Sequence, residues 1–294
     1  MHSLGGVLAP VVTPFDADGD IDDAAFAANV RAHAAAGLSG ALVNGSTGEA
    51  ALLREGERVR LVGLAREALP AGATLLVGVG AESTWQAIDR AREAARAGAD
   101  AVLALPPHYF AGMYTDASVE RYFLAIADAS PVPLLLYNMP KYTHVTLGAG
   151  VVHRLSRHPN VAGMKDSGGD LAQLAHYLEA QGDAFTVLTG HAPTFRDARR
   201  RGARGGILAA ALFAPEPAVA IDRAPEDDAT VEPQSRLGLL GREIVGALGP
   251  AGVKAAMDAA GLAGRHVRAP LLDLSDDARE HVGRLVRGGE PAWV

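Results

Sequence analysis

Residues 161–170 read VAGMKDSGGD, a short apolar run that ends at Lys165 and leads into a glycine-rich turn. The run is too short for a typical helix and does not alternate between apolar and polar residues, which is the pattern of a parallel strand buried on both faces. Seven further runs of this kind occur along the chain, at 6–15 (GVLAPVVTPF), 40–49 (GALVNGSTGE), 74–80 (TLLVGVG), 100–110 (DAVLALPPHYF), 133–140 (PLLLYNMP), 185–191 (FTVLTGH) and 205–210 (GGILAA). The sequence therefore contains eight candidate strands.

Segments with helical periodicity separate these runs, the clearest at 24–36, 55–69 and 84–97. Gly37, Pro70 and Gly98 follow them, as expected where a helix ends and the chain turns into the next strand. Ser83 is the expected N-cap of the third helix. Eight such units within roughly 210 residues predict a (β/α)8 TIM barrel rather than an open sheet.

The chain stays helical in pattern after the last strand, with helices predicted at 236–248, 252–260 and 276–286. The simplest organisation is a barrel over residues 1–222, with C-terminal helices over 223–294 packed on it.

Composition narrows the class of function. Hydrophobic residues make up 49% of the 294 residues, which is enough for a large core. The net charge of −7 gives no sign of a basic surface that would bind nucleic acid. The lack of cysteine excludes thiolate nucleophiles and cysteine-based metal sites. There is no run long enough to span a membrane and no signal-peptide pattern at the N-terminus, so we expect a cytoplasmic protein.

The active site of a barrel lies where the strands end, so the residues delivered there are the first candidates. The strand ends deliver hydroxyls, a phenol and an amine, in the segments 44–49, 108–109, 137–138, 165–167 and 189–191. They deliver no cluster of histidines or carboxylates that predicts a metal site, and the segment 78–83 lacks the third glycine of a dinucleotide fingerprint. We therefore expect neither a metal nor another cofactor.

Lys165 is the most informative single residue, because it stands at the end of an apolar strand. Desolvation disfavours an ammonium and leaves a neutral amine that can attack a carbonyl carbon. The alternative is a lysine that reaches solvent or pairs with Asp166. The sequence has only two other lysines that could be the nucleophile. Lys141 lies in a loop near the barrel mouth, and Lys254 lies on a C-terminal helix, where we expect a structural role.

Two further strand ends suit the same chemistry. Tyr137 ends the strand next to that of Lys165, so its phenol can move protons at the amine; the alternative is an ordinary core tyrosine. The turn at 45–49 offers the hydroxyls of Ser46 and Thr47 and backbone N–H groups for a carboxylate. Equally, this turn can be a helix N-cap with Glu49 in the first turn.

These residues together resemble the family of dihydrodipicolinate synthase and N-acetylneuraminate lyase. The motifs that carry the resemblance span nearly the whole chain, at 13–15 (TPF), 45–49 (GSTGE), 107–109 (PHY), 137–140 (YNMP), 163–166 (GMKD), 205–207 (GGI) and 253–256 (VKAA). The resemblance implies a homotetramer built from two tight dimers. It also implies that Lys165 forms an imine with a 2-keto acid and that Tyr137 shuttles protons there. By the same resemblance Ser46 relays protons, Thr47 binds the keto-acid carboxylate, and Tyr109 is offered across the dimer interface to the neighbouring site.

The departures from the family pattern bear on the substrate. Dihydrodipicolinate synthases usually carry an arginine shortly after the Tyr-Asn-x-Pro motif, where this chain has Lys141, Tyr142 and Thr143. Lys141 supplies a charge there but lacks the bidentate fork of arginine. The acidic pair by which sialic acid lyases bind a sugar is replaced by 191–193 (HAP). The segment 165–170 (KDSGGD) looks more like aldolases and dehydratases of 2-keto-3-deoxy sugar acids.

We therefore predict a metal-free, Schiff-base lyase that cleaves or forms a bond between pyruvate and an aldehyde, acting on a 2-keto-3-deoxy sugar acid. The alternatives are a 4-hydroxy-tetrahydrodipicolinate synthase that condenses pyruvate with aspartate semialdehyde, a sugar-acid dehydratase, and a non-catalytic protein that binds a keto acid. The residues predicted to contact substrate, beyond the catalytic set of Lys165, Tyr137, Ser46 and Tyr109, are Thr47, Gly48, Tyr142, Ser167, Gly190, His191 and Leu208.

Overall fold

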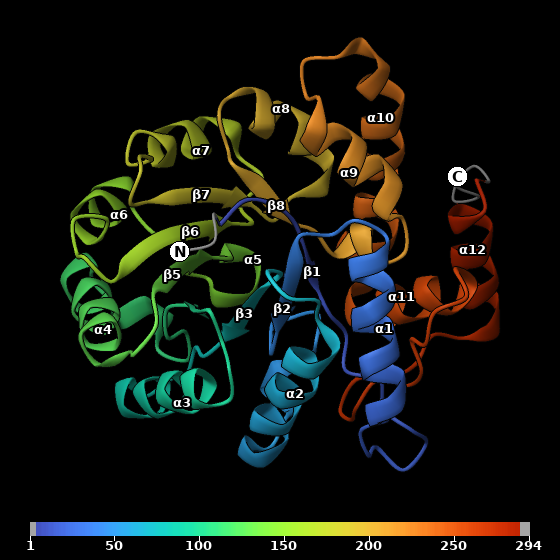
Figure 1. Cartoon of the computed structure of the whole chain (residues 1–294), viewed down its shortest axis with the longest axis horizontal. Helices are drawn as coiled ribbons and strands as arrows, with labels where there is room; N and C mark the ends of the chain where they lie inside the picture. Colours follow the sequence, from blue (N-terminus) through green and yellow to red (C-terminus); the bar gives the residue numbers. More distant parts are fainter. Residues whose placement is uncertain (1–3, 289–294) are drawn as a thin grey trace.

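The computed structural model describes residues 4–288, which form a closed barrel of eight parallel strands in sequence order (Figure 1). The last strand pairs with the first, since Gly6, Val7 and Leu8 lie opposite Gly205, Gly206 and Ile207. The strands are β1 (Gly6–Pro10), β2 (Gly40–Val43), β3 (Thr74–Gly78), β4 (Ala101–Ala104), β5 (Leu134–Asn138), β6 (Val161–Asp166), β7 (Thr186–Thr189) and β8 (Gly205–Ile207). Each falls within one of the eight predicted runs, so the TIM-barrel prediction is confirmed.

Helices connect the strands and cover the outside of the barrel. They are α1 (Asp23–Ala35), α2 (Glu55–Ala68), α3 (Thr84–Arg96), α4 (Asp116–Ala129), α5 (Pro140–Thr143), α6 (Ala149–Leu155), α7 (Leu171–Leu178), α8 (Phe195–Arg200) and α9 (Pro215–Arg223), with short 3-10 turns η1 (Ala50–Leu52), η2 (Ala111–Met113), η3 (Ala192–Thr194), η4 (Ala209–Leu212) and η5 (Asp228–Thr230). Ser83 precedes α3 as predicted, but its hydroxyl makes no capping hydrogen bond. None of the helices in residues 4–288 combines the length and the apolar character needed to cross a membrane.

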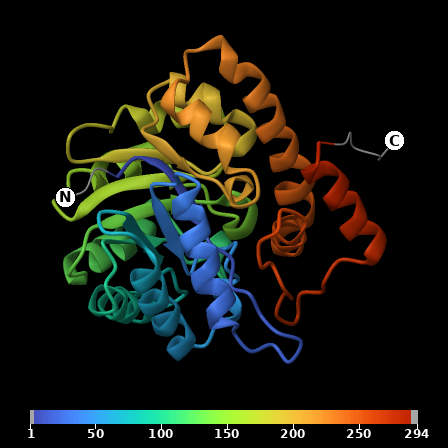
Figure 2. The same cartoon turned by 45° about the vertical axis from the view of Figure 1, so that its right-hand side comes forward.

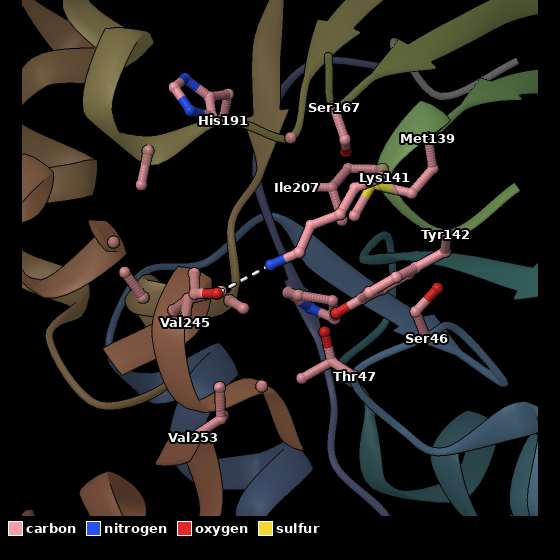
Figure 3. A pocket seen from close by; sticks show the side chains of 18 of the residues that line it. Ser46, Thr47, Met139, Lys141, Tyr142, Ser167, His191, Ile207, Val245 and Val253 are labelled. Carbon is pink, nitrogen blue, oxygen red and sulfur yellow. Dashed lines mark hydrogen bonds between the residues drawn. The ribbon is translucent and has the colours of Figure 1, made fainter. Parts of the chain in front are cut away.

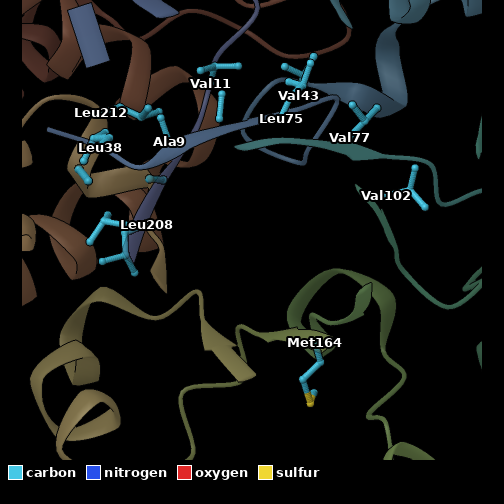
Figure 4. Packing of buried hydrophobic residues seen from close by; sticks show 14 of the residues in the cluster. Ala9, Val11, Leu38, Val43, Leu75, Val77, Val102, Met164, Leu208 and Leu212 are labelled. Carbon is cyan, nitrogen blue, oxygen red and sulfur yellow. The ribbon is translucent and has the colours of Figure 1, made fainter. Parts of the chain in front are cut away.

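The strands place alternate side chains inside and outside the barrel, because the side-chain period of a strand is two residues. The inner cluster fills the barrel with nine side chains, Leu8, Leu42, Leu76, Ala101, Leu103, Leu135, Tyr137, Leu188 and Ile207. Val43 and Leu75, which neighbour inner residues along their strands, join the outer cluster between the sheet and the helices, and so does Met164 of β6 (Figure 4). Because Met164 faces outward, Lys165 faces the interior of the barrel.

The C-terminal region packs against one side of the barrel (Figures 1 and 2). It consists of α10 (Val231–Leu240), the π-helical segment η6 (Gly241–Gly246), α11 (Ala247–Ala259) and α12 (Asp276–Val286). The helix predicted at 276–286 is confirmed. The one predicted at 236–248 is wrong in its limits, since α10 begins earlier and a π-helical segment follows it. The division of the chain at residue 222 stays a prediction, and its last residues, 289–294, lie outside the described residues.

Gly249 breaks the helical path inside α11, with φ 57° and ψ −146°. Such a backbone conformation is open to glycine and strained for residues with a Cβ atom. Pro250 follows and starts the remaining helical turns from the new direction. This kink and the π-helical segment before it bring backbone of the C-terminal region to the mouth of the barrel, as the lining of the cavity there demonstrates.

Candidate active site

A cavity of about 400 Å³ lies at the carboxyl ends of the strands, between the barrel mouth and the C-terminal region (Figure 3). Eight of the predicted site residues line it, namely Ser46, Thr47, Tyr137, Tyr142, Lys165, Ser167, Gly190 and His191. The strand ends therefore bring the amine, the phenol and the hydroxyls to one enclosure, as the reading of the sequence predicted.

Lys165 and Tyr137 face each other across neighbouring strands, since β5 and β6 pair in a register that places them opposite one another. The Lys165 Nζ atom donates a hydrogen bond to the Tyr137 Oη atom at 3.2 Å and lies 4.3 Å from the centre of the ring. Each residue is only 5% exposed. The amine therefore neither reaches bulk solvent nor behaves as a surface group, and its partner is a phenol that can take and return a proton.

Asp166 does not serve as the partner of Lys165. Its Oδ1 atom instead accepts hydrogen bonds from the Asn138 amide at 2.7 Å and from the Gly168 N–H at 3.1 Å. Burial raises the pKa of the Asp166 carboxyl, and these two hydrogen bonds oppose the rise. The carboxylate thus fixes the turn after β6 and leaves the amine free to act as a nucleophile.

Gly190 gives the Lys165 side chain its room. A Cβ atom at position 190 would lie 2.7 Å from the Lys165 Cε atom and 2.0 Å from the Ser167 Oγ atom. Only glycine fits beside this lysine without displacing it. Gly190 therefore contributes space to the cavity rather than a polar contact from a side chain.

The turn at 45–49 presents Ser46 and Thr47 to the cavity (Figure 3). The N–H groups of Gly48 and Glu49 close the turn on the Gly45 and Ser46 carbonyls, at 3.1 Å each. Within residues 4–288 the N–H groups of Ser46 and Thr47 donate to no protein acceptor. Two hydroxyls and two N–H groups can therefore hold a carboxylate at this end of the cavity.

The remaining residues of the turn are structural. Gly48 does not line the cavity, because the position of its absent Cβ is only 2.8 Å from the Val11 carbonyl oxygen. Glu49 precedes η1 in a left-handed conformation, with φ 56°, and does not lie in the first helical turn, so the N-cap alternative is wrong in that respect. Its buried carboxylate pairs with Lys254, at 2.5 Å from Nζ, which confirms a structural role for Lys254.

Ser167, His191 and Tyr142 form the outer part of the lining. The His191 Nδ1 atom lies 2.9 Å from the Thr194 hydroxyl. Burial lowers the pKa of His191, and the positive charge of Arg242 lowers it further. Tyr142 is 42% exposed, although the burial of its phenol raises its pKa. The imidazole and the phenol therefore face the cavity as neutral groups near pH 7.

Leu208 and Tyr109 lie away from this cavity. Leu208 is fully buried in the outer cluster (Figure 4), because Ile207 before it takes the inward position and the next residue along must face outward. Leu208 therefore does not line the cavity, whereas Ile207 and Ala209 do, and its predicted contact with substrate stays a prediction. Tyr109 is 78% exposed, and its N–H donates to the Glu82 carboxylate at 2.9 Å. Its predicted place in the site of another subunit stays a prediction.

Among residues 4–288, no group of three or more His, Cys, Asp or Glu side chains lies close enough together to hold a metal ion. The chemistry available at the cavity is that of a buried amine, a phenol and hydroxyl groups.

Comparison with known proteins assigns the chain to a family. The model of the dihydrodipicolinate synthetase family matches residues 3–288. The chain belongs to this family. A 4-hydroxy-tetrahydrodipicolinate synthase of Hyphomonas neptunium is 36% identical over 271 residues, which cover 90% of this chain and 92% of that protein.

Solved structures of the family share the whole architecture. A dihydrodipicolinate synthase from Bacillus anthracis is 29% identical, with a TM-score of 0.91 over 98% of this chain and 99% of that one. One from Acinetobacter baumannii, solved in complex with pyruvate, is 28% identical, with a TM-score of 0.91 over 97% of this chain and 98% of that one. Since members of the dihydrodipicolinate synthetase family are Schiff-base aldolases, this chain is a pyruvate-dependent class I lyase.

The C-terminal region forms one wall of the cavity, and the sequence did not predict this wall. It consists of Gly241, Arg242, Val245, Gly246, Gly249, Pro250 and Val253. Helical periodicity gave no sign of it, because a π-helical turn shifts the face that a helix presents by one residue. The pair Gly249–Pro250 was the available signal, since this dipeptide interrupts a helix.

Proposed function

We propose that this enzyme condenses pyruvate with an aldehyde that carries a carboxylate, with aspartate semialdehyde as the first candidate. The observation that carries the proposal is the contact between the buried Lys165 amine and the Tyr137 phenol in a cavity of small-molecule size. The curated relatives, which share about a third of their residues with this chain, are named 4-hydroxy-tetrahydrodipicolinate synthase, and this favours condensation over our prediction of a sugar acid.

The proposed reaction begins when the Lys165 Nζ atom attacks the C2 carbonyl carbon of pyruvate. The resulting carbinolamine loses its hydroxyl as water after Tyr137, with Ser46 as relay, delivers a proton to that oxygen. Thr47 and the N–H groups of the 45–49 turn hold the pyruvate carboxylate. The protonated imine withdraws electrons, so the Tyr137 phenolate takes a proton from C3 and an enamine forms. The enamine carbon attacks the aldehyde carbon, and the aldehyde oxygen takes the proton back from Tyr137. Water then hydrolyses the new imine, which releases the product and restores the amine.

Cleavage of a 2-keto-3-deoxy sugar acid is the second candidate, and the identity of residue 142 favours it. Tyr142 lines the cavity where dihydrodipicolinate synthases usually place an arginine after the Tyr-Asn-x-Pro motif. A phenol donates to a sugar hydroxyl but supplies no charge for a carboxylate. The same amine and phenol would run the reaction in reverse, from the imine of the sugar acid to the enamine of pyruvate and a free aldehyde.

A substrate panel separates these candidates. The purified enzyme would be given pyruvate with aspartate semialdehyde, and separately a set of 2-keto-3-deoxy sugar acids, with condensation product and released pyruvate as the two readouts. The proposal predicts the larger kcat/KM for the condensation. Faster pyruvate release from a sugar acid would reverse the order of the two candidates. A keto-acid product without carbon–carbon cleavage would instead identify a dehydratase, and binding without any turnover a non-catalytic protein.

Tyr137→Phe is expected to lower kcat by about 10²- to 10⁴-fold, the usual contribution of a positioned acid–base group. The variant keeps the ring and the packing in the inner cluster but loses the hydroxyl that the Lys165 amine contacts. Single-turnover trapping with borohydride would show imine formation slowed by a similar factor. Tyr177→Phe is the matched control, because its hydroxyl bonds to the Leu147 carbonyl away from the cavity. Turnover unchanged by Tyr137→Phe would remove the phenol from the mechanism.

We also propose that the enzyme self-associates through the surface around Tyr109, as the family resemblance implies for a homotetramer. Large apolar side chains are exposed in this region, with Trp85 at 77%, Tyr109 at 78% and Met113 at 78%. Exposed apolar groups that lie close together favour a protein interface. Sedimentation velocity would measure the assembly, and a monomer at micromolar concentration would contradict it. The cytoplasmic location expected from the sequence is likewise a proposal, which cell fractionation would test.

A further inference from the structure

The charged groups that line the cavity are all cationic. Lys141, Lys165 and Arg242 line it, and among residues 4–288 neither an aspartate nor a glutamate does. In the proposed mechanism Lys165 becomes the imine, and the pyruvate carboxylate is held at the 45–49 turn. Two cations at the mouth therefore have no part in the chemistry at pyruvate.

Arg242 belongs to the π-helical segment η6, on the C-terminal side of the cavity. Such segments are frequent at functional sites, because they present side chains that a regular helix would turn away. Its positive charge lowers the pKa of His191, which lines the same cavity. It makes no ion pair with any carboxylate in the described part of the chain.

Lys141 approaches the same region from the opposite side, from α5 (Figure 3). Its Nζ atom reaches across the cavity and donates to the Gly246 carbonyl of η6 at 2.7 Å. A carbonyl is a dipole and leaves the positive charge of the ammonium uncompensated. Arg242 and Lys141 therefore add two net positive charges to the lining of the cavity.

We propose that Arg242 and Lys141 form a second anion-binding end of the cavity, which takes the terminal carboxylate or phosphate of the aldehyde partner. The inference rests on the proposed function, since it assumes an aldehyde that meets pyruvate at Lys165. Guanidinium groups bind carboxylate and phosphate oxygens through two parallel N–H bonds, so Arg242 supplies the fork that Tyr142 and Lys141 lack. The bidentate fork that the segment after β5 does not provide comes from the C-terminal region instead.

The test compares aldehydes that differ only in the terminal anion, with pyruvate constant. Succinic semialdehyde is paired with butanal, and glyceraldehyde 3-phosphate with glyceraldehyde. Arg242→Gln is expected to raise KM at least about 10-fold for the anionic member of the pair that the enzyme prefers, and to change KM less than about 2-fold for the neutral one. Lys141→Gln is expected to raise KM for the same anionic aldehyde by only about 3-fold, because an ammonium is a single point charge.

Arg200→Gln is the matched control, since this arginine pairs with Glu226 on the outer surface and its removal takes the same charge from the molecule. The control is expected to leave both KM values within about 2-fold of the original enzyme. Titration calorimetry of the pyruvate-loaded protein with succinate and with inorganic phosphate gives a readout independent of turnover. At least one anion is expected to bind, and Arg242→Gln is expected to remove that binding.

The outcomes separate this inference from the proposed function. If borohydride traps pyruvate on the original enzyme but Arg242→Gln affects anionic and neutral aldehydes alike, or neither anion binds, the anion-binding end is wrong and the Schiff-base function stands. If no adduct with pyruvate forms at all, the proposed function itself fails. A larger effect in the phosphate pair or in the carboxylate pair supports the inference and identifies the anion.

Discussion

Lys165→Ala is expected to abolish the covalent adduct with pyruvate and to lower kcat/KM by about 10⁴-fold or more, the scale of losing a catalytic nucleophile. Among residues 4–288, its side chain is the only amine in contact with the Tyr137 phenol inside the barrel. Without it, C2 of pyruvate forms no imine, and the electrons of C3 have no sink. Borohydride reduction in the presence of pyruvate, followed by intact mass, measures the adduct directly.

Lys141→Gln is the control for the adduct, because it removes the other lysine of the cavity and keeps Lys165. This variant is expected to retain the full mass increase from trapped pyruvate. An adduct that survives Lys165→Ala, or one that disappears in Lys141→Gln alone, would transfer the imine to Lys141 and contradict the mechanism.

The sequence was sufficient to predict that Lys165 and Tyr137 lie next to each other. Both stand at the ends of short apolar runs, and in a barrel with strands in sequence order the fifth and sixth strands are neighbours. The local pattern therefore determined the three-dimensional proximity. The same reasoning placed Ser46, Thr47, Ser167, Gly190 and His191 at the cavity, because each follows a strand end on the same face of the barrel.

The order of the strands was not enough to place Leu208 and Gly48 relative to the cavity. Leu208 follows β8 directly, but whether a residue faces the cavity or the outer core depends on parity along the strand, and Ile207 takes the inward position. Gly48 lies within a predicted binding turn, but the turn folds it against the Val11 carbonyl. In both cases the place of the residue relative to the cavity depends on register and close packing, which residue types alone do not specify.

The sequence did not predict that Arg242 lines the cavity, for a different reason. Its place at the mouth depends on a π-helical turn and on how the C-terminal region packs on the barrel more than 70 residues after Lys165. Residues so far apart meet only through tertiary packing, to which helical periodicity is blind. The substrate-recognition end of the cavity therefore required the structure, whereas the catalytic end did not.

Lys254→Met is expected to destabilise the protein by about 3–5 kcal/mol, the loss typical of breaking a buried ion pair from one side. The Lys254 Nζ atom lies 2.5 Å from the Glu49 Oε1 atom, with side chains only 1% and 0% exposed. It also donates to the His266 carbonyl at 2.6 Å and lies 4.5 Å from the centre of the Phe15 ring. Burial lowers the pKa of Lys254, and the charge of Glu49 opposes that shift, so Lys254 depends on Glu49 to keep its charge.

The matched double variant, Glu49→Gln with Lys254→Met, separates the ion pair from packing. The glutamine keeps an oxygen for the Arg268 N–H, which bonds to Glu49 at 2.8 Å, and buries no unpaired charge. The double variant is expected to recover about half or more of the stability that Lys254→Met loses. This recovery corresponds to a coupling of about 1.5–3 kcal/mol between the two residues, which is the size found for contacting residues. The single variant Glu49→Gln completes the cycle. Urea midpoints of the original enzyme, the two single variants and the double variant measure the coupling, and Lys141→Met is the control for removing an exposed lysine. Losses that simply add would show that the two charges do not depend on each other.

The location of this pair connects stability with the active site. Glu49 ends the turn that presents Ser46 and Thr47, whereas Lys254 sits on α11, whose first turns line the cavity. Breaking the pair therefore loosens the two walls that must hold pyruvate and its partner in place. We expect the folded fraction of Lys254→Met to show a raised KM for pyruvate and an unchanged mass of the Lys165 adduct, because the nucleophile on β6 lies outside the affected contact. A KM equal to that of the original enzyme would show that the turn is positioned by Thr13, which donates to the Gly48 carbonyl at 2.8 Å, and by its own hydrogen bonds.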